Sequence, residues 1–496
     1  MKKILFLMLC MLPLSYLHAK DLPYDVLVDN FGYKIAEEGA SVSYIENKSS
    51  LSSVQLPENV TYQDVSYPVI AIEAGAFSQT GLTRIVLPPL LKKIGDAAFE
   101  YCSNLENVAF PTSLEEIGMN AFRECKSLEK ADLPHSVFKM GDAAFSGCTA
   151  LASVIVPSSL KNIPNSAFSS CSFKTIELHD GLESIGEKAF YNCSELQSIK
   201  VPDGVSHIGG AAFAYCLQLT SVFIPKSVTF IGEISRDFTS LFTRDDRLKE
   251  VVVEDSNPVY DSRDNCVGII ETATNTLLFA CRNTIIPNTI GTIGEKAFSY
   301  AGSKFSYIEP DVFVENFTIK IPDSVKKIGD NAFYHCNYMD NIVLPNSVTE
   351  MGENVFYYCE QLRSIVIGEN VPSLVYCFRE CSNLKDIYCF PTTPPRLAEP
   401  SDNIGIYEWE HTYNRPFLHV KNGYKDAYEQ TEWSFCYIVE DLTDGIAQIH
   451  DSQSIMPNEE GTLYDLSGRQ MVNGKWLNGK LQKGIYIQNG KKVVLK

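Results

Sequence analysis

The chain has 496 residues, of which 45% are hydrophobic and 21% are charged, and its formal net charge is −19 at pH 7. This composition is typical of a globular protein or a long repeat array, and it excludes a disordered or membrane-embedded chain. The acidic balance without a basic stripe argues against nucleic acid as a partner, because phosphate contacts need clustered lysines and arginines.

The first twenty residues read MKKILFLMLCMLPLSYLHAK, with two lysines followed by an apolar run from Ile4 to Leu14. A basic start, an apolar run and a small-residue end predict a secretory signal peptide at residues 1–19. The run is too short to span a bilayer, and no later segment has about 18 uninterrupted apolar residues. We therefore expect an exported protein without a transmembrane helix, located at the cell surface or outside the cell.

A repeat of 22 or 23 residues occupies most of the chain. Each unit follows the pattern A-F-x-x-C-x-x-L-x-x-[IV]-x-[LVI]-P-x-S-[VL]-x-x-I-G, as in residues 189–211. A phenylalanine and a cysteine three residues later mark each unit, and the pairs are Phe99 and Cys102, Phe122 and Cys125, Phe145 and Cys148, Phe168 and Cys171, Phe190 and Cys193, Phe213 and Cys216, Phe333 and Cys336, Phe356 and Cys359, Phe378 and Cys381.

The pattern of one unit predicts a short strand followed by a turn. After Leu196, the apolar residues Ile199 and Val201 occupy alternate positions, which is typical of a strand. Pro202 ends that strand, because proline cannot donate to a ladder of hydrogen bonds. A single unit cannot bury its own apolar side, whereas stacked units share a continuous core. We therefore expect a solenoid whose neighbouring strands lie about 4.8 Å apart.

The unit resembles the BspA-like leucine-rich repeat, whose core is F-x-x-C-x-x-L-x-x-I-x-[LIV]-P. The resemblance implies an α+β, β-rich, right-handed curved solenoid with one short parallel strand per coil and small β caps. It also suggests the domain boundaries: a β-rich entry cap at residues 20–64, a repeat solenoid at 65–398 with an insertion-bearing coil at about 235–287, and a closing cap at 399–445.

The C-terminal part follows a polar linker that we place at residues 446–458. Within residues 459–496, Asn489-Gly490 lies between two apolar segments, which predicts a β-hairpin because both residues tolerate positive φ. This unit is similar to the C-terminal sorting domains of type IX secretion cargo, and the resemblance implies export by that route. The alternative is a small terminal β unit without a role in export.

The periodic cysteines allow four interpretations: disulfides, a metal site, nucleophiles or buried packing. Parallel Cβ directions along a stack do not fit the disulfide torsion of about 90°. Metal sites need converging ligands, and no histidine shares the cysteine period to act as a base. We therefore predict that Cys125, Cys148 and their equivalents are reduced, buried and inert. Cys266 and Cys281 flank the hairpin-like insertion, and the sequence leaves both alternatives open for them, a disulfide or two free thiols.

No group of residues in the sequence has the spacing of a known catalytic, cofactor-binding or metal-binding site. The histidines are scattered, and neither a phosphate-binding glycine loop nor a G-x-S-x-G turn occurs. Asp261, Asp264 and Glu271 lack the spacing of a calcium loop. We predict a non-enzymatic protein that needs no cofactor and no metal.

The residue before the last core residue of each predicted strand should face outward, since side chains alternate along a strand. In the C-terminal half this row is mostly apolar, which suggests a partner-binding stripe. An alternative is that these residues only favour strand formation, or that the insertion covers them. The candidate stripe consists of Ile155, Phe223, Val252, Val343, Val366 and Tyr388.

The resemblance implies a monomeric surface protein whose partners are other extracellular or surface proteins. The resemblance also implies adhesion, including adhesion to host extracellular-matrix proteins such as fibronectin or fibrinogen. The alternative function is a glycan-binding accessory protein of a surface polysaccharide system, since aromatic rows can stack against sugars. Such a row lies beside the cysteines at Tyr101, Tyr215, Tyr300, Tyr334 and Tyr358.

Overall fold

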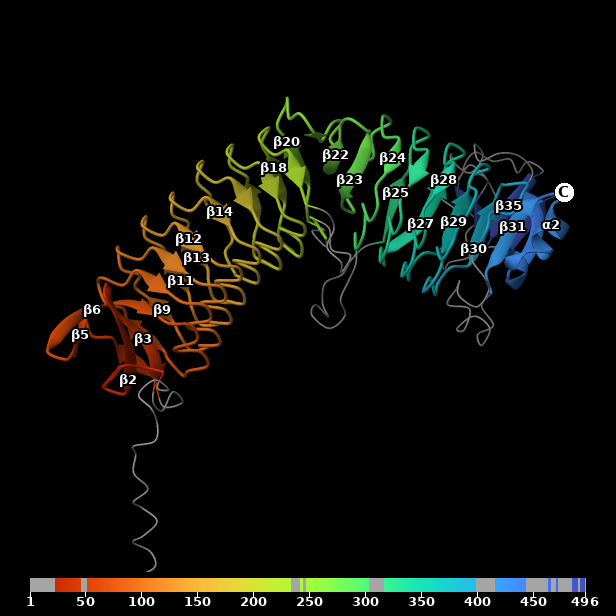
Figure 1. The fold of residues 1–496 in the computed structure, drawn as a ribbon. Coiled ribbons are helices and arrows are strands. Elements are labelled where there is room, and N and C mark those ends of the chain that lie inside the picture. The colour runs from red at the N-terminus through yellow and green to blue at the C-terminus, as the bar shows by residue number, and fades with distance from the viewer. Residues whose placement is uncertain are drawn as a thin grey trace, which may run out of the picture. The chain divides into compact units, whose positions relative to one another are not determined.

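The computed structural model describes residues 23–45, 51–232, 241–243, 247–302, 316–397 and 415–442, together with the backbone of four strands between residues 463 and 495. The predicted signal peptide and the predicted linker lie outside the described residues. The chain divides into two compact units, Met1–Asp261 and Ser262–Lys496. In each unit, coils stack side by side around a shared core (Figure 1).

The first unit begins with a β-rich segment. Its strands are β1 (Val26–Val28), β2 (Phe31–Ala36), β3 (Gly39–Ile45), β4 (Ser53–Gln55), β5 (Asn59–Tyr62) and β6 (Val65–Ile72). The pairs β1–β2 and β2–β3 are antiparallel, whereas β3 pairs in parallel with β6. Strand pairing within this segment therefore passes from antiparallel to the parallel arrangement of the coils.

Most coils of the first unit contribute two short strands. The front strands come from the [IV]-x-[LVI]-P segment and are β7 (Arg84–Val86), β9 (Asn107–Val108), β11 (Lys130–Asp132), β13 (Ser153–Ile155), β16 (Ser198–Lys200), β18 (Ser221–Ile224) and β20 (Glu250–Val253). The side strands end at the Ile of Ile-Gly or its equivalent and are β8 (Lys93–Ile94), β10 (Glu116–Ile117), β12 (Lys139–Met140), β14 (Asn162–Ile163), β15 (Ser184–Ile185), β17 (His207–Ile208) and β19 (Phe230–Ile231). The unit ends with β21 (Tyr260–Asp261).

Both kinds of strand pair in parallel and in register from one coil to the next. Lys130 of β11 lies opposite Ser153 of β13, and Glu116 of β10 lies opposite Lys139 of β12. The β-rich leucine-rich repeat solenoid is therefore confirmed. The expectation of one strand per coil is incomplete, because the side strands add a second parallel sheet that the sequence pattern did not reveal.

The phenylalanines of the repeat stack on one another in the core. The ring centroids of Phe99 and Phe122 are 5.0 Å apart with planes at 10°, and those of Phe122 and Phe145 are 5.2 Å apart at 3°. These separations slightly exceed the spacing of paired strands, which allows the offset stacking that aromatic rings prefer. Phe122 is thus sandwiched between the phenylalanines of its two neighbouring coils.

The turn around each phenylalanine uses backbone conformations that depend on neighbouring coils. Asn120 and Glu124, on either side of Phe122, have φ values of 55° and 61°. Left-handed backbone costs a non-glycine residue about 1–2 kcal/mol. The amide of Glu124 donates to the carbonyl of Ser146 at 2.7 Å, one coil further on. Hydrogen bonds between coils therefore hold a turn that one coil would not maintain alone.

The glycine of each Ile-Gly pair is needed for close packing of coils. A Cβ atom added to Gly118 would lie 2.5 Å from the backbone nitrogen of Asp96 in the preceding coil. Real Cβ contacts are essentially never that short. The glycine therefore allows the two backbones to approach, and it does not serve a left-handed turn at this position.

The second unit starts with the hairpin that the insertion was expected to carry. Strands β22 (Gly268–Glu271) and β23 (Thr276–Ala280) pair antiparallel, and β23 then pairs in parallel with β24 (Thr292–Ile293). Two further side strands follow, β26 (Lys327–Ile328) and β28 (Glu350–Met351). The front sheet has the order β25 (Phe317–Lys320), β27 (Met339–Leu344), β29 (Ser364–Ile367), β30 (Asp386–Cys389), β31 (Phe417–Lys421) and β32 (Tyr437–Leu442).

The closing segment covers the last coil with a large aromatic residue. Helix α2 (Lys425–Glu429) and the 3₁₀ helix η3 (Glu432–Phe435) connect β31 to β32. Trp433 is fully buried, its ring centroid lies 6.4 Å from that of Phe378, and its Nε1 donates to the carbonyl of Pro395 at 2.8 Å. The indole ring therefore closes the phenylalanine stack.

The C-terminal strands form a small antiparallel sheet. They are β33 (Leu463–Tyr464), β34 (Gln470–Met471), β35 (Gly484–Gln488) and β36 (Lys491–Leu495), in the order β34-β33-β35-β36. Gln488 lies opposite Lys491, so two residues connect β35 and β36, as the Asn-Gly pair predicts. No helix among the described residues is long and apolar enough to cross a membrane.

Candidate functional site

The periodic cysteines form a buried ladder of hydrogen bonds. Sγ of Cys125 donates to the carbonyl of Phe99 at 3.2 Å, and Sγ of Cys148 donates to the carbonyl of Phe122 at 3.1 Å. Each thiol thereby satisfies a carbonyl at the core turn of the preceding coil. Cysteine fits here because it is small and apolar, yet still offers a weak donor.

The cysteines described by the structure, from Cys102 to Cys436, are free and buried. Burial raises the pKa of Cys193 to about 12, although backbone hydrogen bonds partly offset this effect. The thiolate, which is the nucleophile and the metal ligand, is therefore not formed at physiological pH. Cys266 and Cys281 are likewise reduced thiols, so the disulfide that the sequence left open is not formed.

In the first unit, the candidate stripe lies on the outward face of the front strands. Ile155 of β13 is 50% exposed and Val252 of β20 is 38% exposed. Phe223 of β18 lies between them in the chain and is half-buried, and the Nζ of Lys200 lies 5.8 Å from its ring centroid. Phe223 pairs with Lys200 and Val252 across neighbouring strands, so these three residues form one row.

In the second unit, the structure corrects one member of the candidate stripe. Val366 of β29 is only 5% exposed, because it packs with Phe390 and Leu442 in a small cluster of its own. Val343 and Tyr388 are half-buried against the same cluster. The outward face of this sheet is therefore partly a second core, and Val366 is not available to a partner.

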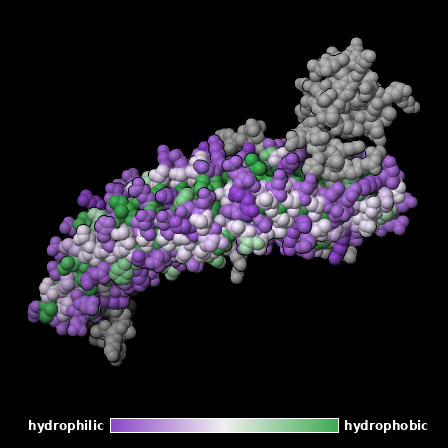
Figure 2. Space-filling model, turned by 90° about the horizontal axis from the view of Figure 1, so that it is seen from above, coloured by the Kyte–Doolittle hydropathy of each residue, from purple (hydrophilic) through white to green (hydrophobic). Residues whose placement is uncertain are grey.

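The structure exposes an apolar residue that the sequence analysis did not include. Ile285 precedes Ile286-Pro287, just as Phe223 precedes Ile224-Pro225, and its side chain is 64% exposed. The I-I-P motif was visible in the sequence, but it lies beside the insertion, where the 23-residue period is interrupted. Figure 2 shows one face of the protein on which apolar surface occurs as small separate patches among polar side chains.

A histidine lies between two carboxylates on the outward face of the last three front strands. Nδ1 of His419 is 2.9 Å from Oδ2 of Asp441, and its Nε2 is 3.2 Å from Oδ1 of Asp386. Its ring stacks on Tyr388 with centroids 4.5 Å apart. Burial disfavours the charged imidazolium, but the hydrogen bonds and charges of both aspartates outweigh burial and raise its pKa to about 9. His419 is therefore a cation at neutral pH and joins β30, β31 and β32.

The tyrosine row is divided between the two units. In the first unit, the guanidinium of Arg123 lies 5.5 Å from the ring centroid of Tyr101. In the second unit, Tyr357 and Tyr358 stack with centroids 4.4 Å apart, and Arg379 lies 5.4 Å from the ring of Tyr357. These rings mainly contact each other and neighbouring cations. Among the described residues, no three His, Cys, Asp or Glu side chains could hold a metal ion.

A family model described as BspA type leucine rich repeat region matches residues 70–169, 115–241 and 307–394, which together exceed half of the chain. The search of curated proteins found no match.

Several solved structures are similar to this chain. A leucine rich cell surface protein from Faecalibacterium prausnitzii is 22% identical, covers 89% of this chain and 100% of its own, and has a TM-score of 0.53. A leucine-rich repeat protein from Bacteroides ovatus is 24% identical over 74% of this chain and 95% of its own, with a TM-score of 0.44. The pneumococcal vaccine antigen PcpA is 18% identical over 84% and 98%, with a TM-score of 0.43. The first of these shows the fold.

Proposed function

This chain belongs to the BspA type leucine-rich repeat family, and on that premise we propose that it is an exported, non-enzymatic protein that binds other proteins at the cell surface. Family proteins with this repeat are typically interaction proteins, and the similar F. prausnitzii structure is named a cell surface protein. We further propose that the function is adhesion and that host extracellular-matrix proteins are among the partners.

The observation that carries this proposal is the outward row of the first unit. Val252 of β20 is exposed and lies opposite Phe223 of β18, which is half-buried with Lys200 beside it. Ile155 is exposed on the outward face of β13, at the end of the preceding front sheet. Strands held in a parallel sheet present these side chains without the entropy loss of ordering a loop. An apolar row with a flanking cation fits a partner protein that offers an apolar ridge and a carboxylate.

Binding of the full chain to immobilised fibronectin and fibrinogen tests the proposal. Ile155→Asp and Val252→Asp each place a charge in the row, and we expect each to weaken binding at least tenfold. Phe138→Asp is the matched control, because Phe138 is equally exposed but lies outside the front strands. Equal binding by folded row variants and wild type would remove this row from the proposed function.

A second candidate function is glycan binding, favoured by the stacked rings of Tyr357 and Tyr358 beside Arg379. Aromatic faces and a cation can hold a sugar ring and its acidic substituents. A glycan array distinguishes the two functions: Tyr357→Ala would abolish binding to sugars, whereas Ile155→Asp would leave it unchanged.

For export, we propose that residues 1–19 are a cleaved signal peptide and that the C-terminal antiparallel sheet is a type IX sorting unit. The sorting proposal is supported by the sequence resemblance and by the hairpin of β35 and β36. Expression with and without residues 459–496 in a bacterium that has this secretion route provides the test. Intracellular retention of the shortened chain is expected, and its normal appearance at the surface would exclude the sorting role.

A further inference from the structure

A cavity of about 390 Å³ lies in the second unit at the end of β25. It is lined by Asn288 from one coil and by Lys320, Ile321, Pro322, Asp323 and Ser324 from the next. Its volume falls within the range of sites that hold small ligands or a few residues of peptide. No aromatic residue lines it, so it offers no ring on which a sugar could stack.

Among the described residues, the two coils that enclose the cavity are joined at the side strands and at the phenylalanine turns, but not at the front strands. On the side-strand face, Thr292 pairs with Lys327 and Ile293 with Ile328, and the rings of Phe298 and Phe333 stack at 5.0 Å. On the front face, β25 pairs with β27 but has no second partner strand among the described residues. The front edge of β25 therefore presents backbone donors and acceptors that a further strand could use.

Three side chains with hydrogen-bond donors line the cavity. In the part of the chain that the structure describes, the ammonium of Lys320 has no ion pair and the amide of Asn288 has no hydrogen bond. The hydroxyl of Ser324 is buried and likewise has no partner. In a regular coil the equivalent serine, Ser113, donates to two carbonyls of the preceding coil at 2.8 Å. Ser227 and Ser347 also lack partners, so it is the combination with the cavity that distinguishes Ser324.

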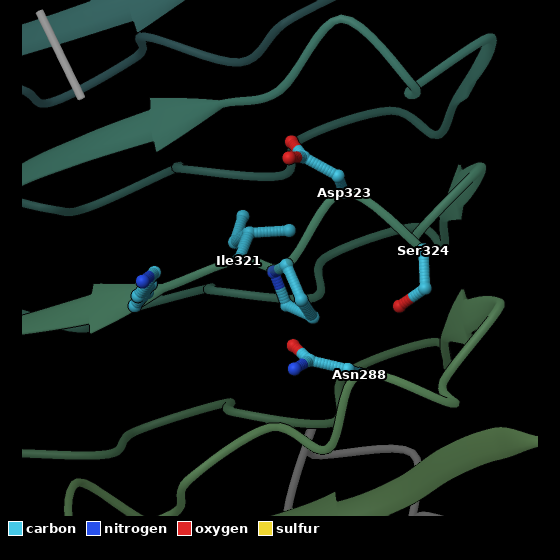
Figure 3. A pocket seen from close by; sticks show the side chains of 6 residues that line it. Asn288, Ile321, Asp323 and Ser324 are labelled. Carbon is cyan, nitrogen blue, oxygen red and sulfur yellow. The ribbon is translucent and has the colours of Figure 1, made fainter. Parts of the chain in front are cut away.

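The orientation of the side chains favours an anionic group in the cavity. Figure 3 shows the side chain of Ser324 pointing toward the coil of Asn288, whereas that of Asp323 points away from it. A hydroxyl, an amide and an ammonium group are all donors suited to a carboxylate. Ile285, three residues before Asn288 in the chain, has an exposed apolar side chain.

We propose that an extended segment of a partner protein adds as a strand to the free edge of β25 and places an acidic side chain in the cavity, against Lys320. Main-chain hydrogen bonds to an open sheet edge supply affinity in this kind of recognition, and a side-chain pocket supplies specificity. This site goes beyond the proposed function, because it lies in the second unit and does not involve the row of Ile155 and Val252.

Fluorescence anisotropy with the full chain tests the proposal. The probe is a labelled peptide, Thr-Glu-Val-Thr-Val-Glu-Thr. It has a glutamate near each end, so that either a parallel or an antiparallel strand can place one in the cavity. Its C-terminus is amidated, so that the only carboxylates are those of the two glutamates. Saturable binding is expected. The peptide Thr-Glu-Pro-Thr-Pro-Glu-Thr keeps the charges but lacks two backbone donors, and we expect it to bind at least tenfold more weakly.

A charge exchange tests the role of the cavity. Lys320→Glu is expected to weaken binding of the glutamate peptide at least tenfold, and to favour the same peptide with lysine in place of glutamate. Lys326→Glu is the matched control, since Lys326 is an exposed lysine of the same coil that does not line the cavity. This control should leave both affinities unchanged.

Four results would overturn the proposal: no binding by wild type at millimolar peptide, equal binding of the proline peptide, equal binding by Lys320→Glu, or binding of free glutamate as tightly as the peptide. The last result would identify a small-molecule site instead. None of these results depends on the matrix-protein assay of the first unit, so the two proposals fail separately.

Discussion

The ion pair network of His419 makes the stability of the closing segment depend on pH. His419 is held by Asp386 on β30 and Asp441 on β32, and its side chain is only 15% exposed. Charged side chains on the same strands include Lys421, whose Nζ lies 2.7 Å from Oε1 of Glu369, and Glu440, whose Oε1 accepts from the backbone amides of Gly423 and Lys425. The folded protein stabilises the protonated form of the His419 side chain more than the unfolded chain does. Folding therefore raises the pKa of His419 from 6.5 to about 9.

The sign and size of the effect follow from this difference. A raised pKa contributes its full stability below pH 6.5, and the contribution is lost as pH rises through about 9. One pKa unit corresponds to 1.36 kcal/mol, so the contribution amounts to at most about 3 kcal/mol. We therefore expect the free energy of unfolding of the closing segment to fall by about 3 kcal/mol between pH 6 and pH 9.5.

Urea unfolding followed by the fluorescence of Trp433 measures this quantity in the segment that contains His419, with Trp409 and Trp476 replaced by phenylalanine. His419→Gln should be less stable than wild type at pH 6 and should lack the loss between pH 6.5 and 9. His207→Gln, which changes an exposed histidine of the first unit, should keep the wild-type profile. Parallel pH profiles for wild type and His419→Gln would refute the reasoning.

Three further predictions concern the repeat. Phe122→Ala removes a ring sandwiched between two others and should lower the free energy of unfolding by about 3–5 kcal/mol, whereas Phe138→Ala, at an exposed site, should change it by less than about 0.5 kcal/mol in the same urea titration. Gly118→Ala should destabilise by about 1–3 kcal/mol because the added Cβ meets the preceding backbone, whereas Gly291→Ala has open space; similar melting temperatures for both would contradict the packing argument. Cys148 and the other described cysteines should not react with a thiol reagent until the protein is unfolded in urea, and stoichiometric labelling of the native chain would disprove their burial.

The features that depend on neighbouring residues or on the repeat itself were predictable from the sequence. Phe122 and Cys125 recur with the same neighbours, so one coil defines the environment of the next, and the period alone places both in the core. The hairpin of β35 and β36 was predictable for a similar reason, since two turn residues determine its connection. The side strands were missed because their two extended residues acquire a sheet partner only when coils stack.

The sequence by itself thus determined the period, the stacked core and the family. Only the tertiary structure decided which outward residues remain available. Val366 is buried because Leu442, far along the chain, folds back over it, and Asp386 and Asp441 meet His419 only through the parallel order of β30, β31 and β32. Among the described strands, β25 likewise ends its sheet where the repeat is interrupted. Burial on an outward face depends on which distant segment packs against it, and a local pattern of alternating residues carries no information about that contact.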